Sequence, residues 1–171
     1  MGNLKSMSQP QPINYVDALI EYYGAMGHPP YQWTVNENAP LHHLNKPLNE
    51  CTVSILVSGG VSACGVPGFN PDARNDHRLD EVPSDFAANN FQIHDSYYDH
   101  TDAEADINCI FPLERLREMA EEGKIGAVAK RLWSGFMGRI YNRSKVIEES
   151  APQFAQALIA DEVDLLIASP S

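Results

Sequence analysis

Three short runs of apolar residues predict buried β-strands. They cover residues 52–58, 125–129 and 163–168, and the first of them is rich in β-branched side chains. Short, nearly continuous apolar runs are typical of strands that are covered on both faces of a parallel sheet.

Between these runs, apolar residues recur at helical spacing over residues 112–123 and 144–159. A proline in the first turn begins the first of these helices, and a glycine ends it. Ser144 is a candidate cap for the second helix. Pro152 predicts a kink in that helix, because proline cannot donate a backbone hydrogen bond.

Two further segments, one at the start of the sequence and one internal, show different patterns. Residues 1–12 are polar and predict a flexible tail, and Asn14 is a candidate cap for a helix over residues 15–26. Residues 61–106 show no long periodic pattern and predict a loop-rich insertion, which in a compact domain is often functional.

The order strand, helix, strand, helix, strand predicts an α/β fold. We expect a single domain over residues 13–171, with a parallel sheet and helices on both faces, as in Rossmann-like and flavodoxin-like proteins. Small molecules bind such sheets beyond the carboxyl ends of the strands. The candidate places are therefore the loops after Ser58 and Ala129 and the segment that begins at Ser169.

Composition removes several classes of function. The 171 residues carry 23 acidic and 12 basic side chains, a net charge of −11, which opposes nucleic-acid binding. No apolar run is long enough to span a membrane, and the first residues lack the apolar core of a secretory signal. Three cysteines without a paired motif suit a reducing compartment, so we expect a cytoplasmic protein.

The loop after the first strand is the first candidate site. Ser58, Gly59 and Gly60 would let backbone N–H groups approach a small anionic ligand closely. Cys64 follows in the same loop, where backbone dipoles could stabilise a nucleophilic thiolate. The alternative is that Cys64 only fills space as a small apolar side chain.

The second candidate site is the segment 94–106, which holds two histidines and five carboxylates. His94, Asp99 and His100 are candidate catalytic residues, or candidate ligands of a transition metal. Asx turns in a solvated loop would explain the aspartates as well. The spacing matches no standard metal motif, so the cofactor stays unknown. The candidate substrate-binding residues of this segment are Tyr98, Asp102 and Asp106.

A third candidate is the glycine-flanked stretch 134–138, which we place in a ligand-facing turn. Met137 and Gly138 are its candidate substrate-binding residues. Arg78, in the loop-rich insertion, could clamp a carboxylate ligand or pair with a neighbouring aspartate, and the pairing is the ordinary interpretation.

Taken together, several segments resemble the glycine/sarcosine/betaine reductase selenoprotein B family, which includes the selenoprotein subunit of D-proline reductase. The resemblance covers the chain from about residue 30 to its last residue, and its most specific part is Tyr98-Asp99 with the aspartates and Asn108 that follow. It rests on residues 40–48, 58–61, 94–108, 111–116 and 136–138.

The resemblance implies reductive cleavage of a carbon–nitrogen bond in a small amine or amino-acid derivative, usually beside a partner subunit that contains a pyruvoyl group. In the family a selenocysteine or cysteine attacks the substrate, and it would follow Ser169 and Pro170. This chain stops at Ser171. We therefore hypothesise a truncation at a selenocysteine codon, with Cys64 as the substitute thiol if the end is genuine.

Three functions stay open at this point. In a thiol- or selenol-dependent reductase, which needs no further cofactor, His94 or His100 would move a proton and Asp99 would orient the histidine. The same three residues would be the centre of a metal-dependent enzyme. A non-catalytic binding relative is the third possibility. A partner subunit or a homo-oligomer is compatible with all three.

Overall fold

The computed structural model describes residues 14–30, 35, 37–38 and 42–170, in two compact units, 1–42 and 43–171. The predicted tail over residues 1–12 lies outside the described residues. Helix α1 (Tyr15–Ala25) is in the first unit, and none of its residues is buried. Asn14 does not cap this helix, because its side-chain amide donates to the Asp17 carboxylate instead.

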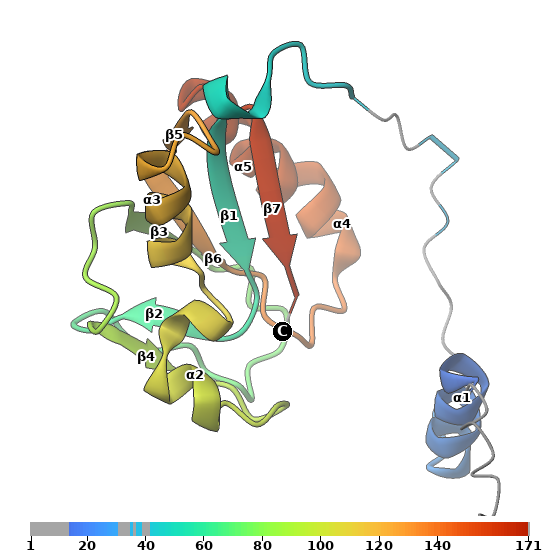
Figure 1. Cartoon of the computed structure of the whole chain (residues 1–171). Coiled ribbons are helices and arrows are strands. Elements are labelled where there is room, and N and C mark those ends of the chain that lie inside the picture. The colour runs from blue at the N-terminus through green and yellow to red at the C-terminus, as the bar shows by residue number, and fades with distance from the viewer. Residues whose placement is uncertain (1–13, 31–34, 36, 39–41, 171) are drawn as a thin grey trace, which may run out of the picture. The chain divides into compact units, whose positions relative to one another are not determined.

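The second unit is built on a five-stranded sheet (Figure 1). Its central strand pairs in parallel with three others, and the remaining strand runs antiparallel to one of those three. The strands are β1 (Thr52–Val57), β3 (Leu79–Pro83), β5 (Ala127–Val128), β6 (Arg131–Gly135) and β7 (Leu165–Ser169).

Strands β5 and β6 share one edge of β1. The first pairs with the start of β1 and the second with Leu56 and Val57, while β7 runs along the whole of the other edge. The predicted strand over 125–129 is therefore shorter than expected. The prediction of a loop after Ala129 is wrong, because residues 131–135 form a second strand beside β1.

Helices flank the sheet on both faces (Figure 1). Helix α3 (Leu113–Glu121) buries Leu113 and Leu116 against the face of β1 that carries Val53 and Ile55. On the other face, α5 (Ala151–Ala160) packs Phe154 on Trp133 of β6, with ring centroids 5.1 Å apart. The expected α/β fold with a mostly parallel sheet is confirmed, and its Rossmann-like or flavodoxin-like topology stays a prediction.

The predicted helix over residues 144–159 is divided into three parts. It begins as α4 (Arg143–Lys145), capped by Asn142 rather than Ser144. A π-helical turn, η3 (Val146–Ser150), then leads into α5. Pro152 lies in the first turn of α5, so its missing N–H falls where the helix changes its hydrogen-bond pattern. Within the described residues, no helix is long and apolar enough to cross a bilayer.

The loop-rich insertion contains short elements that periodicity did not predict. Strands β2 (Val61–Ala63) and β4 (Phe91–Ile93) form an antiparallel pair, followed by α2 (Thr101–Ala105). The short 3₁₀ helices η1 (Leu48–Glu50) and η2 (Ile107–Cys109) precede β1 and α3. Each of these elements is too short to show a helical or strand period in the sequence.

The hydrophobic core lies between β1 and α3 and continues into the β2–β4 pair. Apolar side chains from the sheet, from α3 and from the insertion contact one another there, which makes the insertion part of the same folding unit. The fully buried members are Val53, Ile55, Val57, Val61, Val82, Phe111, Leu113 and Leu132.

A buried ion pair fastens the end of α5 to β6. The Asp161 side chain is fully buried and accepts from Arg131 Nε at 2.6 Å and from Arg131 Nη2 at 3.0 Å. Lys130 Nζ lies 2.9 Å from the same carboxylate. These contacts hold the pKa of Asp161 below its ordinary value, chiefly through the Arg131 hydrogen bonds. The carboxylate therefore stays charged at neutral pH.

Candidate functional site

The carboxyl ends of β1, β6 and β7 lie at one edge of the sheet, because the three strands are parallel. The backbone N–H of Ser58, directly after β1, donates to the carbonyl of Ser169 at 3.4 Å. The glycine-containing loop after β1 therefore lies beside the end of β7. We call this edge, with Ser58, Gly59 and Gly60 at its centre, the carboxyl edge.

The two stretches singled out in the sequence contact each other at this edge. The backbone N–H of His94 donates to the carbonyl of Gly60 at 2.9 Å. The hydroxyl of Tyr98 donates to the carbonyl of Gly59 at 2.8 Å. The loop after β1 and the stretch that contains His94 and Tyr98 are thus in contact at the carboxyl edge, as the sequence predicted.

Two glycines lie where the stretches meet, and glycine is required at one of them, Gly60. Gly60 has a φ of +67°, and a Cβ there would lie 2.3 Å from the carbonyl oxygen of His94. A Cβ at Gly68 would lie 2.5 Å from the imidazole ring of His94. The contact at Gly60 is with backbone, so a side chain there would force the two stretches apart, whereas the exposed ring of His94 can rotate away from Gly68.

Tyr98 acts as a hydrogen-bond donor at this edge. Burial of its ring, together with the charge of Asp95, raises the pKa of Tyr98 to about 12. The hydroxyl therefore keeps its proton at neutral pH and can hold the Gly59 carbonyl in place. Tyr98 was expected to bind substrate, and its hydroxyl contacts the loop that would do so.

Three aspartates of the second stretch form turns. Asp95, Asp99 and Asp106 each accept the backbone N–H of the residue two positions later. The side chains of Thr101 and Asn108 also donate to Asp99 and Asp106, and these hydrogen bonds lower the pKa of both carboxyls. The contacts match the Asx-turn interpretation of these residues. Asp102 lies exposed on α2.

The two histidines lie in different surroundings. His94 is exposed, with its ring against Gly68. His100 Nδ1 lies 2.9 Å from Glu104 Oε1, and its ring meets the Tyr98 ring edge-on at 5.8 Å between centroids. Among the described residues, no group of three histidine, cysteine, aspartate or glutamate side chains is placed to hold a metal ion. The candidate ligands His94, Asp99 and His100 therefore do not come together in one ligand set in the described part of the chain.

Cys64 is exposed and lies at the end of β2 that is farther from Gly60. The strand between the two positions advances the chain by about 10 Å. The backbone N–H of Cys64 donates to the carbonyl of Asn90, in the turn before β4. Cys64 therefore belongs to the outer end of the β2–β4 pair, while Ser58 and Gly59 belong to its inner end.

The exit of β6 contributes a feature that the sequence did not reveal. Met137 is buried and Gly138 exposed, and both are flanked by left-handed residues, Phe136 with φ +51° and Arg139 with φ +63°. Non-glycine residues rarely adopt this conformation, and such backbone strain is concentrated at functional sites. No residue type in this stretch signals it, because glycine and asparagine are its usual carriers.

The guanidinium of Arg78 is paired with a carboxylate of the protein itself. Its guanidinium makes two hydrogen bonds to the Asp80 carboxylate, at 2.7 and 2.6 Å, and lies over the ring of Phe69. Further donors reach the carbonyls of Pro67 and Gly68. The pairing predicted as the ordinary interpretation of Arg78 is confirmed.

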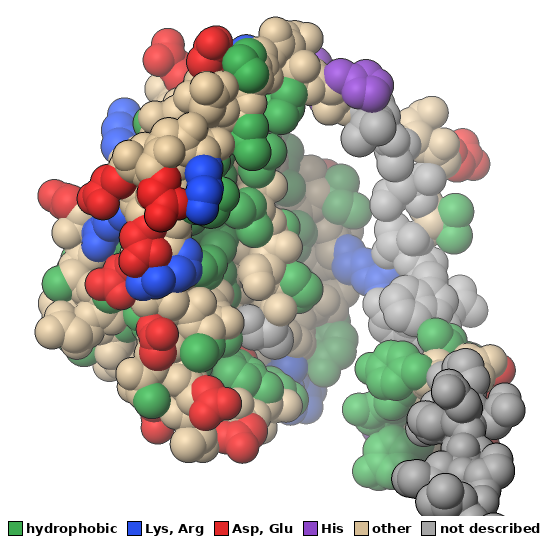
Figure 2. Space-filling view, viewed as in Figure 1, with side chains coloured by type: hydrophobic (Ala, Val, Ile, Leu, Met, Phe, Trp, Pro, Cys, Tyr) green, Lys and Arg blue, Asp and Glu red, His purple; other side chains and the backbone are tan. Residues whose placement is uncertain are grey.

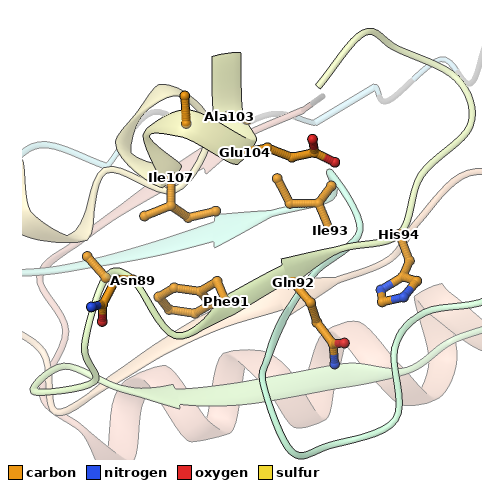
Figure 3. A pocket seen from close by; sticks show the side chains of 10 residues that line it. Asn89, Phe91, Gln92, Ile93, His94, Ala103, Glu104 and Ile107 are labelled. Atoms are coloured by element: carbon orange, nitrogen blue, oxygen red, sulfur yellow. The ribbon is translucent and has the colours of Figure 1, made fainter. Parts of the chain in front are cut away.

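A pocket of about 500 Å³ lies next to the carboxyl edge, between β4 and α2 (Figure 3). Phe91, Ile93 and Ile107 provide apolar walls, and the Glu104 carboxylate is the charged group nearest to Ile93 in the close-up. His94, at the end of the pocket, points its ring away from these apolar side chains. Of the predicted site residues, His94 alone is among those lining the pocket.

Comparison with known proteins places this geometry in context. The model of the glycine/sarcosine/betaine reductase selenoprotein B family matches residues 28–170. The D-proline reductase subunit gamma of Acetoanaerobium sticklandii is 32% identical over 139 residues, which cover 81% of this chain and 53% of that protein. This chain therefore spans about half the length of that relative.

A second relative is the glycine reductase complex component B subunit gamma of Carboxydothermus hydrogenoformans. It is 28% identical over 132 residues, covering 73% of this chain and 28% of that protein. The comparison with solved structures gave no match.

Proposed function

Because this chain belongs to the glycine/sarcosine/betaine reductase selenoprotein B family, we propose that it forms the substrate-binding wall of a reductase subunit. The reaction is reductive cleavage of a carbon–nitrogen bond in a small amine or amino-acid derivative. The observation that carries this proposal is the meeting of Ser58–Gly60, Tyr98 and the end of β7 at the carboxyl edge.

The position of β7 supports this location for the chemistry. The family resemblance puts the selenocysteine or cysteine after this strand, and Ser169 at its end contacts Ser58. The nucleophile would follow Ser171 and so lie at least three positions beyond Ser169, and three extended residues span about 10 Å. From there a selenolate or thiolate could reach the backbone dipoles of the Ser58–Gly60 loop, which would stabilise it.

The proposed reaction is a two-electron reduction in which the carbon–nitrogen bond breaks. The selenolate or thiolate attacks the carbon that carries nitrogen and forms a bond to it, and the carbon–nitrogen bond breaks with its electron pair leaving on nitrogen. His94, exposed beside the loop, is the candidate donor of the proton that the departing amine takes. One thiolate of an external dithiol then attacks the selenium or sulfur, and the bond from that atom to carbon breaks with its electron pair on carbon, which takes a proton. The second thiolate attacks the first sulfur of the dithiol, so the dithiol becomes a disulfide, having supplied two electrons, and the selenolate or thiolate is regenerated.

Cys64 fits this reaction less well than a nucleophile after β7. It lies at the outer end of β2, away from the loop and from the end of β7. A partner subunit is part of the proposal, since both relatives are named as subunits of reductases.

Ligand mapping tests the proposed site. Glycine, sarcosine, betaine and D-proline are each added to the isotopically labelled chain, with acetate as the matched ligand that lacks nitrogen. We expect NMR shift changes at the backbone amides of Ser58, Gly59 and Gly60 with at least one amine, and much weaker changes with acetate. Changes confined to the pocket beside Phe91 and Ile107, or no changes up to the solubility limit, contradict the proposal.

Replacing Tyr98 by phenylalanine tests the role of its hydroxyl. Tyr98→Phe removes the hydrogen bond to the Gly59 carbonyl, so we expect a loss of about 1 kcal/mol in the free energy of unfolding and weaker ligand binding. Urea denaturation and the NMR titration measure the two effects. Tyr97→Phe is the matched control, because Tyr97 is 60% exposed. Equal behaviour of the two variants would show that Tyr98 does not position the loop.

A further inference from the structure

Strand β7 is apolar but incompletely covered. Its sequence is Leu-Leu-Ile-Ala-Ser, and none of its residues is buried; Ile167 is 38% exposed. In the neighbouring strand, by contrast, Val53, Ile55 and Val57 are at most 2% exposed. Hydrophobic side chains lie open to view over this side of the sheet (Figure 2). A nearly continuous apolar strand is expected to be covered on both faces, and β7 is not.

The outer edge of β7 carries backbone groups that could pair with a further strand. Ser169 faces β1, because its carbonyl accepts from Ser58. By alternation Ile167 and Leu165 face β1 too, and the N–H and C=O groups of Leu166 and Ala168 point away from it. In the part of the chain that the structure describes, β7 pairs with β1 alone.

The edge also lacks the usual protection against pairing. Natural edge strands are commonly blunted by lysine, by proline or by an inward-pointing charge. Residues 165–169 contain none of these. An apolar, uncharged edge with exposed backbone groups is instead typical of a strand that lies inside a larger sheet.

We propose that a further strand pairs with the outer edge of β7, and that it comes from the polypeptide corresponding to the unmatched part of the D-proline reductase subunit gamma. That relative contains roughly as much sequence again as the part this chain matches. A second copy of this chain is a poorer occupant, because each copy carries a net charge of −11 and the two would repel. One end of the added strand would lie next to the carboxyl edge, so the loop at that end would be close to the proposed site.

Amide hydrogen exchange tests this proposal without requiring substrate or activity, so it can fail independently of the proposed function. Exchange at Leu166 and Ala168 is measured in this chain alone and in a fusion that joins it to the relative's unmatched part in the order in which the relative carries the two. We expect these amides to exchange at least about tenfold more slowly in the fusion. Unchanged rates in a folded fusion overturn the proposal.

The intact relative provides a second measurement if the fusion does not fold. The positions that align with Leu166 and Ala168 should be protected there, and fast exchange at both positions would overturn the proposal. Protection of β7 in this chain alone, together with a dimeric mass in light scattering, would assign the edge to a second copy and also overturn it.

A matched pair of variants locates the effect on the strand. In the fusion, Ile167→Lys places a charge on a β7 side chain that neighbouring side chains of the added strand would flank, and we expect the weakened pairing to restore fast exchange at Leu166 and Ala168. Val66→Lys puts the same charge on a residue with 43% exposure at the outer end of the β2–β4 pair, and should leave that exchange slow. If both variants act alike, the added segment does not cover β7.

Discussion

Gly60→Ala is expected to lower the free energy of unfolding by about 3 kcal/mol, through left-handed backbone strain and a steric clash together. The residue has a φ of +67°, and the new methyl would lie 2.3 Å from the His94 carbonyl oxygen. That carbonyl is backbone, so relief requires the loop and the His94 stretch to move apart. Urea denaturation measures the loss, and the hydrogen bond from His94 to Gly60 should weaken with it.

Alanine substitutions at two other glycines separate the cost of backbone strain from the cost of the steric clash. Gly65 has a φ of +95°, and a methyl added there would meet no neighbouring atom within 4 Å, so Gly65→Ala measures the backbone strain alone, about 1 kcal/mol. Gly138→Ala meets neither strain nor contact and should be close to neutral. If Gly60→Ala costs no more than Gly65→Ala, the loop and the His94 stretch are not tightly packed against each other.

Asp161→Asn is expected to lower the free energy of unfolding by about 2 to 3 kcal/mol. The side chain is fully buried, and its neutral replacement leaves Arg131 with one carboxylate partner fewer at the junction of α5 and β6. Glu122→Gln is the control, because the ion pair of Glu122 with Lys124 is exposed on both sides. Comparable losses in the two variants would show that the Asp161 cluster contributes no more than a surface pair.

The contribution of Asp161 should also depend on pH. Hydrogen bonds from Arg131 lower the pKa of Asp161 in the folded state, so the stabilisation is fully present above the unfolded pKa of about 4. It is lost as the pH falls through the lower folded value. Unfolding curves of the wild type and Asp161→Asn should therefore converge in acid, and a constant difference down to the lowest accessible pH would contradict this origin.

The sequence predicted those elements whose residues are apolar throughout or recur at helical spacing. Strands β1 and β7 and helix α3 belong to this group. Strand β6 was missed because it contains polar residues that are satisfied only by tertiary contacts. The Ser134 hydroxyl, for example, donates to the Val61 carbonyl at 2.6 Å, and Arg131 pairs with Asp161. Such contacts have no local signature.

The contact between the two candidate stretches was predicted from the sequence, while the roles of their residues stay predictions. Glycines after a buried strand and a stretch rich in histidine and aspartate indicated where ligands would meet the sheet, and the two do touch. Whether Asp99 orients a histidine or forms a turn depends on the position of Thr101, two residues away, and composition does not reveal that position. The left-handed residues Phe136 and Arg139 lie equally beyond local pattern, because their backbone is set by the surrounding packing.

The raised pKa of Tyr98 affects how the pH dependence of a reaction at the carboxyl edge would be interpreted. With a pKa of about 12, it undergoes no ionisation across the neutral range. The hydrogen bond from Tyr98 to the Gly59 carbonyl therefore does not change as the pH is varied across this range. Any inflection near neutrality in a pH–rate profile measured at this edge would therefore come from a group other than Tyr98.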